Sequence, residues 1–161
     1  MLGQKNILRE VITTCALVTP LALVVNYWAD LPDVVPIHFG IRGQPDNWGS
    51  KWWILLLPTV SLVIWAILVT VRRFPHRFNY PFEITPLNRK RQEMLALNLV
   101  DWLRLEIAVL FALATWLQVS VAVGRSGGLG IWFLPGTLAI LVITIGMYFR
   151  AAGRKTVKDR L

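Results

Sequence analysis

The sequence predicts an all-α fold: a polytopic membrane protein with four transmembrane helices, an ordered outer loop and an amphipathic cytoplasmic helix. Hydrophobic residues make up 55% of the chain and charged residues only 16%, whereas about a quarter of the residues in a typical soluble domain are charged. Four apolar windows also reach the roughly 17–25 residues that a helix needs to cross a hydrocarbon core of about 30 Å. These windows are residues 11–29, 52–71, 105–123 and 131–149.

Lys and Arg residues are distributed unevenly between the segments outside these windows. Fourteen of them lie in residues 1–10, 72–104 and 150–161, against three in the two other connections. Because cytoplasmic loops carry the excess of Lys and Arg, both termini and the middle connection are expected in the cytoplasm of a bacterial inner membrane protein. The net charge of +8 is therefore read as a topology signal, and no basic patch with interleaved aromatic residues indicates nucleic-acid binding.

The windows also predict the order of the segments along the chain. The expected segments are a cytoplasmic tail at 1–10, a transmembrane hairpin at 11–71 with a loop at 30–51, a basic cytoplasmic segment at 72–104, a second transmembrane hairpin at 105–149 and a basic tail at 150–161. Four aromatic residues, Tyr27, Trp28, Trp52 and Trp53, flank the first loop and fit the aromatic belt of a membrane interface. The loop is therefore expected to lie at the outer headgroups.

The loop Asp30–Lys51 is the candidate functional segment. It contains three Pro and three Gly, which exclude a helix or a central strand and favour turns. It also contains His, Trp and Arg, which a merely flexible linker would not need. We therefore expect an ordered loop that binds a partner, because rigid aromatic and Arg side chains anchor interfaces. The candidate binding residues are His38, Arg42, Asp46, Trp48, Ser50 and Lys51.

The connection at residues 72–104 predicts an amphipathic helix that lies on the inner leaflet and continues into the third span. Thr85 is the expected N-cap and Pro86 the first helical residue. The candidate residues for binding lipid headgroups are Arg72, Arg73, Arg89, Lys90 and Arg91. Asp101 and Arg104, spaced i,i+3, are expected to pair, and Glu106 is expected to reach back toward water at the interface.

The polar residues of the loop could carry one of three chemistries, or they could form hydrogen bonds that only stabilise the conformation of the loop. A phosphate-binding loop is excluded, because Ser50 precedes Lys51 and no strand feeds the glycines. A divalent metal site from His38 with nearby aspartates matches no known ligand spacing. Adjacent Ser50 and Lys51 do not form a catalytic dyad. We therefore predict neither an enzyme nor a bound metal or cofactor. The one cysteine, Cys15, lies in an apolar run and is expected to pack there.

The loop resembles the signature segment of a family of bacterial membrane proteins that includes the SdpI-type immunity proteins. The pattern LPxxxPIHFxxxGxPDxWGSK begins at Leu31 and ends at Lys51. A second segment, FNYPFEITPLN at Phe78–Asn88, is similar to the family's cytoplasmic connection. Members of that family confer immunity to a secreted toxic peptide and can signal to a repressor. The immunity proteins have further membrane helices, whereas four spans are predicted here.

The leading functional hypothesis is a non-enzymatic membrane protein whose outer loop binds a partner or peptide, in an immunity or sensing role. The expected partners are membrane lipids, a protein or larger membrane complex, and a secreted peptide. The main alternative is an accessory subunit of a larger membrane complex, such as a respiratory or photosynthetic assembly. A metal-dependent enzyme or transporter is the third class, and it lacks paired intramembrane charges and a ligand cluster in the sequence.

Overall fold

The computed structural model of the protein describes residues 6–154. Its four long helices are α1 (Ile7–Tyr27), α2 (Leu56–Val71), α3 (Arg89–Ala122) and α4 (Phe133–Gly153). A 3-10 turn, η1 (Lys51–Leu55), leads into α2, and a second, η2 (Pro75–Arg77), follows it. Each long helix, with η1 included in the second, is long and apolar enough to cross a membrane. The predicted fold class is confirmed, and the chain is a multi-pass membrane protein.

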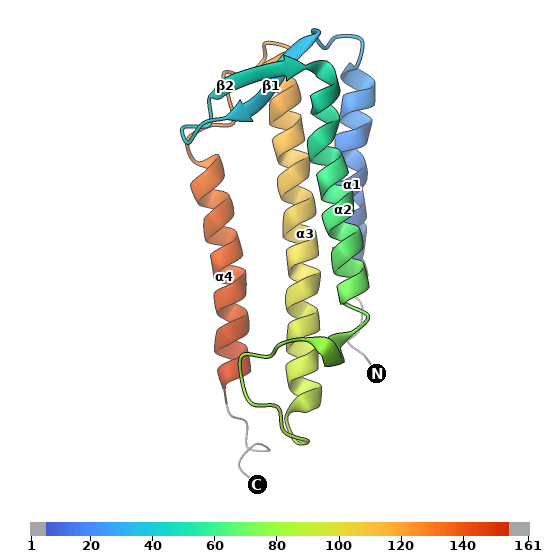
Figure 1. The fold of residues 1–161 in the computed structure, drawn as a ribbon, viewed down its shortest axis with the longest axis vertical. Helices are drawn as coiled ribbons and strands as arrows, with labels where there is room; N and C mark the ends of the chain where they lie inside the picture. The colour runs from blue at the N-terminus through green and yellow to red at the C-terminus, as the bar shows by residue number, and fades with distance from the viewer. Residues whose placement is uncertain (1–5, 155–161) are drawn as a thin grey trace.

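The helices form an elongated bundle in which α3 is central (Figure 1). α3 packs against α1, α2 and α4, whereas α4 packs chiefly against α3 and stands apart from α1 and α2 (Figure 1). A small sheet lies across one end, here called the hairpin end. The start of α1 and the end of α4 lie at the opposite end, here called the basic end (Figure 1). Of the predicted tails at residues 1–10 and 150–161, residues 1–5 and 155–161 lie outside the described residues.

The predicted continuation of the amphipathic segment into the third span is confirmed. The amphipathic segment and the third span form one continuous helix of 34 residues, which begins at Arg89 after the N-cap Asn88. At about 1.5 Å per residue it is about 51 Å long, so its first turns extend beyond a hydrocarbon core of about 30 Å. The expected start at Thr85–Pro86 was three residues too early. Thr85 instead makes reciprocal hydrogen bonds with Asn88 just before the helix.

The polar loop is a β-hairpin, which the sequence analysis did not predict. Strands β1 (Val34–Phe39) and β2 (Pro45–Ser50) pair antiparallel, with a bulge between Pro36 and His38. Proline excludes only central strands, because a missing donor is tolerated where one side of a strand is unpaired. A two-stranded sheet has only edge strands, so Pro36 and Pro45 fit here.

The hairpin is held on the bundle by an apolar cluster at the hairpin end. Val35 of β1 is fully buried and packs with Leu31, with Ile54 of η1, and with residues from two long helices, Val24 and Val119. Fully burying one such side chain stabilises the fold by roughly 1.5–3 kcal/mol. The hairpin is therefore a packed part of the fold and not a mobile tip.

The basic end is tied together by side chains from the start of α3. Arg91 donates a hydrogen bond to the carbonyl of Ala151, and Gln92 donates to that of Ala152 at 2.9 Å. The last carbonyls of a helix have no partner within the helix, so these bonds cap α4. In the connection before α3, Tyr80 donates to the carbonyl of Pro75 at 2.8 Å. Burial raises the pKa of Tyr80 further above neutral pH, so the phenol stays a donor over a wider pH range.

Candidate functional site

The structure brings two of the predicted loop residues together. His38 of β1 and Asp46 of β2 face each other, with Nδ1 of His38 2.5 Å from Oδ1 of Asp46. The ring N–H donates here, because an ionised carboxylate only accepts. Both side chains are more than half exposed, at 66% and 51%. A pair this exposed contributes roughly 0–1 kcal/mol to stability, so its main effect is to fix the direction of the imidazole.

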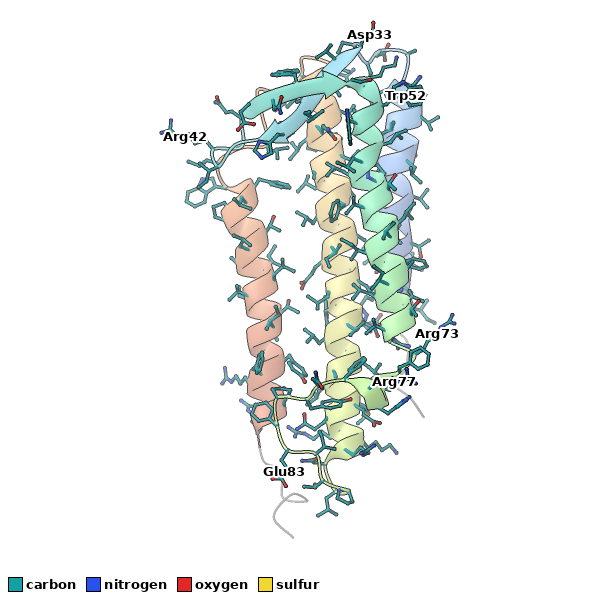
Figure 2. The ribbon with its side chains drawn as sticks, viewed as in Figure 1. Asp33, Arg42, Trp52, Arg73, Arg77 and Glu83 are labelled. Atoms are coloured by element: carbon teal, nitrogen blue, oxygen red, sulfur yellow. The ribbon has the colours of Figure 1, made fainter. Side chains whose placement is uncertain are left out.

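The other predicted loop residues are spread over the hairpin. Lys51 is the first residue of η1, and its ammonium lies 4.9 Å from the centre of the Trp28 ring. Trp48 and Ser50 are exposed on β2. Arg42 lies in the turn and points away from the molecule (Figure 2). These four residues do not meet, so they form an exposed surface and not a catalytic cluster.

The turn of the hairpin is docked on the connection between α3 and α4. The amide of Leu129 donates to the carbonyl of Gly43 at 2.6 Å. Gly43 has a positive φ of 73°, and a Cβ on it would lie 2.5 Å from the carbonyl oxygen of Gly130. A Cβ on Gly128 would lie 2.2 Å from the carbonyl oxygen of Gly43. Glycine is therefore required at this contact, which ties the tip of the hairpin to the start of α4.

A cavity of about 430 Å³ lies beneath the hairpin. Its walls come from β1, the start of α2, the last third of α3 and the start of α4, and His38 is one of the lining residues. The one amide in its lining is Gln118 of α3, which is 3% exposed. Gln118 Nε2 donates to the carbonyl of Pro36 at 2.8 Å, while its Oε1 is buried without a hydrogen-bond partner among residues 6–154.

The sequence analysis assigned no role to Gln118, which lies near the end of the third apolar span. Its partner Pro36 lies 82 positions away, so no local pattern connects the two. The one feature of the sequence that could have identified Gln118 is that it is a single Gln near the end of an apolar span. The hairpin thus covers an apolar cavity, and the amide in its lining keeps a buried oxygen without a hydrogen-bond partner among residues 6–154.

The candidate metal ligands do not gather. Within the part of the chain that the structure describes, no group of three or more His, Cys, Asp or Glu side chains is placed to hold a metal ion. His38 contacts Asp46. Asp33, which Figure 2 labels, lies at the far end of the hairpin (Figure 2).

A buried ionic cluster joins three helices near the basic end. Asp101 of α3, 3% exposed, accepts hydrogen bonds from Arg9 at 2.8 Å, Arg72 at 2.6 Å and Arg104 at 3.2 Å. The expected pairing of Asp101 with Arg104 is confirmed. Arg104 also donates to both oxygens of Glu10 at 3.1–3.2 Å. Sequence analysis missed the rest of this cluster, because Arg9 and Asp101 are 92 positions apart.

The predicted lipid-headgroup residues have different surroundings. Arg72 is engaged by Asp101, and Arg91 by the end of α4. Arg89 lies 3.9 Å from Glu93 and Lys90 is exposed. Arg73 is exposed and points away from the bundle (Figure 2). The headgroup role of all five stays a prediction. Within residues 6–154, Arg73 and Lys90 are the two that make no side-chain hydrogen bond or ion pair.

The expectation for Glu106 was wrong. Its side chain does not reach back toward water but turns to α4, where Oε1 accepts a hydrogen bond from the hydroxyl of Thr144. Its Oε2 is buried without a hydrogen-bond partner among the described residues. Helix packing decides the direction of this side chain, and a single sequence window does not contain that information.

Comparison with known proteins places the best-matched part of the chain around the hairpin. Residues 15–62 match the family model described as "Domain of unknown function (DUF1648)", and they include most of α1, the whole hairpin and the start of α2. An uncharacterized protein of Archaeoglobus fulgidus is 32% identical over 74 residues, which cover 41% of this chain and 40% of that protein. The chain thus spans less than half the length of this relative. No solved structure matches the chain.

Proposed function

We propose that this is a non-enzymatic membrane protein whose hairpin and underlying cavity together form the docking site of a peptide or protein partner. The observation that carries the proposal is the cavity of about 430 Å³ closed by an ordered hairpin with exposed His38, Arg42 and Trp48. Pockets of roughly 300–1,000 Å³ with apolar walls and few polar groups are typical binding sites.

The chemistry of the site favours an extended peptide segment as the partner. An apolar side chain of such a segment fits the cavity, and a peptide N–H is the natural donor for the free Oε1 of Gln118. Trp48, which is 49% exposed, and the exposed Arg42 supply the side-chain types that carry most binding energy at interfaces. The resemblance of the loop to SdpI-type immunity proteins adds a secreted toxic peptide as the specific candidate.

In this proposal the hairpin end of the bundle faces away from the cytoplasm. The excess of Lys and Arg in the connection at the basic end favours a cytoplasmic location for that end in a bacterial inner membrane. The hairpin end then faces outward, where a secreted peptide arrives. Trp28 and Trp52, whose ring centres lie 4.9 Å apart, and Trp53 lie at this end and suit a membrane interface.

Alanine substitution of the exposed hairpin residues tests the proposed docking site. We expect Trp48→Ala and Arg42→Ala each to weaken partner retention by at least about tenfold, because truncating an interface anchor commonly costs about 2 kcal/mol or more. The measurement is quantitative mass spectrometry of proteins and peptides that co-purify from native membranes in mild detergent, together with survival against the secreted peptide.

The matched control is Arg73→Ala, which removes an exposed Arg at the basic end (Figure 2). Thermal unfolding of each variant in detergent must stay close to wild type, because all three side chains are exposed. Unchanged retention and unchanged survival in both hairpin variants would show that the hairpin docks nothing.

A second candidate is an accessory subunit of a larger respiratory or photosynthetic membrane complex, for which α4 offers a contact face that lipid would otherwise cover. α4 packs chiefly against α3 and leaves large apolar side chains exposed along most of its length, including Ile140, Val142 and Ile143. A neighbouring subunit would cover this face. Co-purification of stoichiometric subunits of one large assembly, retained by the hairpin variants, would favour this candidate.

A further inference from the structure

A second cavity lies between α3 and α4, on the basic half of the molecule and separate from the hairpin. It has a volume of about 380 Å³ and is lined by Leu99, Trp102 and Glu106 of α3 and by Thr144, Met147 and Tyr148 of α4, among others. Asn98 and Ala151 also belong to its walls, nearer the basic end. Eight residues separate Asn98 from Glu106, so the groove runs about 12 Å along α3 toward the membrane interior.

The carboxyl group of Glu106, at the inner part of this groove, has a hydrogen-bond partner for only one of its two oxygens among the described residues. Oε1 of Glu106 is bound by the hydroxyl of Thr144, but Oε2 is buried with no hydrogen-bond partner among residues 6–154. Thr144 lies nine residues before the end of α4, about 13 Å along the helix axis. An acidic side chain at such a depth is costly unless it has a partner, and it marks a functional site by default.

No basic side chain among the described residues pairs with Oε2 of Glu106. The cation that touches the lining is Arg9, whose guanidinium lies 5.7 Å from the centre of the Trp102 ring. Arg9 is already bound to Asp101 at 2.8 Å. The groove therefore combines an acceptor oxygen, a hydroxyl and an aromatic ring with apolar walls. That set complements a positively charged nitrogen attached to an apolar body, because ammonium groups pair with carboxylates and are attracted to the faces of Trp rings.

We propose that this groove binds a lipophilic amine dissolved in the membrane. Its ammonium group donates to Oε2 of Glu106 and to the hydroxyl oxygen of Thr144, and its alkyl chain lies along Leu99, Met147 and the ring of Trp102. The opening between two helices at membrane depth gives such a ligand direct entry from the lipid phase. This site is independent of the proposed docking at the hairpin, so either can fail without the other.

Binding of radiolabelled dodecylamine to the full chain tests the assignment. The protein is placed in nanodiscs of phosphatidylcholine and phosphatidylglycerol, and dodecanol serves as the competitor with the same chain but no charge. We expect saturable binding that Glu106→Gln weakens at least about tenfold, because the variant keeps the shape but loses the charge. Thr144→Val should weaken binding less, and dodecanol should not displace the amine.

The matched control is Glu83→Gln, which removes an exposed carboxylate in the connection before α3 (Figure 2). This variant should bind like wild type, and the unfolding temperature of Glu106→Gln in detergent checks that it folds. Equal binding by Glu106→Gln and wild type would overturn the proposal. Loss of amine binding in discs rich in phosphatidylethanolamine would overturn the assignment to a dissolved amine and identify the lipid headgroup as the occupant.

Discussion

Replacing Asp101 with asparagine is expected to lower the free energy of unfolding by about 3–5 kcal/mol, the cost of breaking a buried ion pair. Asp101 is 3% exposed and is the shared acceptor of Arg9, Arg72 and Arg104. The variant keeps the size of the side chain but leaves three guanidinium groups with Glu10 as their remaining acidic partner in the cluster. Equilibrium unfolding in mixed micelles, followed by tryptophan fluorescence, measures the change.

The control for Asp101 is Glu93→Gln, which removes the acidic partner of a partly exposed pair. Glu93 lies 3.9 Å from Arg89, whose side chain is 61% exposed. Such a pair contributes about 0.5 kcal/mol or less, so this variant should unfold close to wild type. If Asp101→Asn also unfolds within about 1 kcal/mol of wild type, the cluster does not hold α1, α2 and α3 together.

Replacing Gly128 with alanine is expected to undock the hairpin from the connection between α3 and α4. The new Cβ would lie 2.2 Å from the carbonyl oxygen of Gly43 and 3.2 Å from the Cα of Gln44, and backbone cannot rotate away as a side chain can. The hydrogen bond from Leu129 to Gly43 must then break, at a cost of about 1–3 kcal/mol for the groups left unpaired. Hydrogen exchange of residues 34–50, measured by mass spectrometry, should become at least about fivefold faster.

The neighbouring Gly127 offers the matched control for this substitution. A Cβ on Gly127 meets nothing within 4 Å, and its φ is not in the left-handed region. Gly127→Ala should therefore leave exchange in the hairpin unchanged. Similar exchange in the two variants would mean that the contact between Gly43 and Gly128 does not position the hairpin.

The four spans could be predicted because the bilayer imposes a length and a composition that single windows reveal. The third span shows where this reasoning stops. The amphipathic segment does continue into residues 105–123 as predicted, but the helix begins at Arg89 and not at Pro86, because Thr85 and Asn88 hydrogen-bond each other and Asn88 takes the N-cap position. The hairpin was missed for a different reason. Proline and glycine were correctly taken to exclude a helix and a central strand, but the loop was then expected to be irregular, although a two-stranded hairpin has only edge strands and tolerates proline.

The sequence located the segment that carries the candidate site, but it did not predict which distant residues contact that segment. The composition of the loop pointed to His38, Trp48 and their neighbours, and the structure places them on one ordered hairpin. The cavity beneath it depends on Gln118, which reaches Pro36 across 82 positions. The surroundings of Asp101 and Glu106 depend equally on which helices pack side by side. Information of this kind lies in tertiary packing, which local spacing does not encode.

The central claim is that the hairpin end faces outward and docks a partner, and site-directed crosslinking tests both parts at once. Arg42→Cys is made in a Cys15→Ser background, since Cys15 is the one cysteine of the chain. A membrane-impermeant, photoreactive maleimide is added to intact cells, with Arg73→Cys as the control at the opposite end (Figure 2). The account predicts labelling at position 42 and not at position 73, and a discrete crosslinked partner after illumination. Labelling at position 73 alone, or labelling at position 42 that captures no partner, would contradict it.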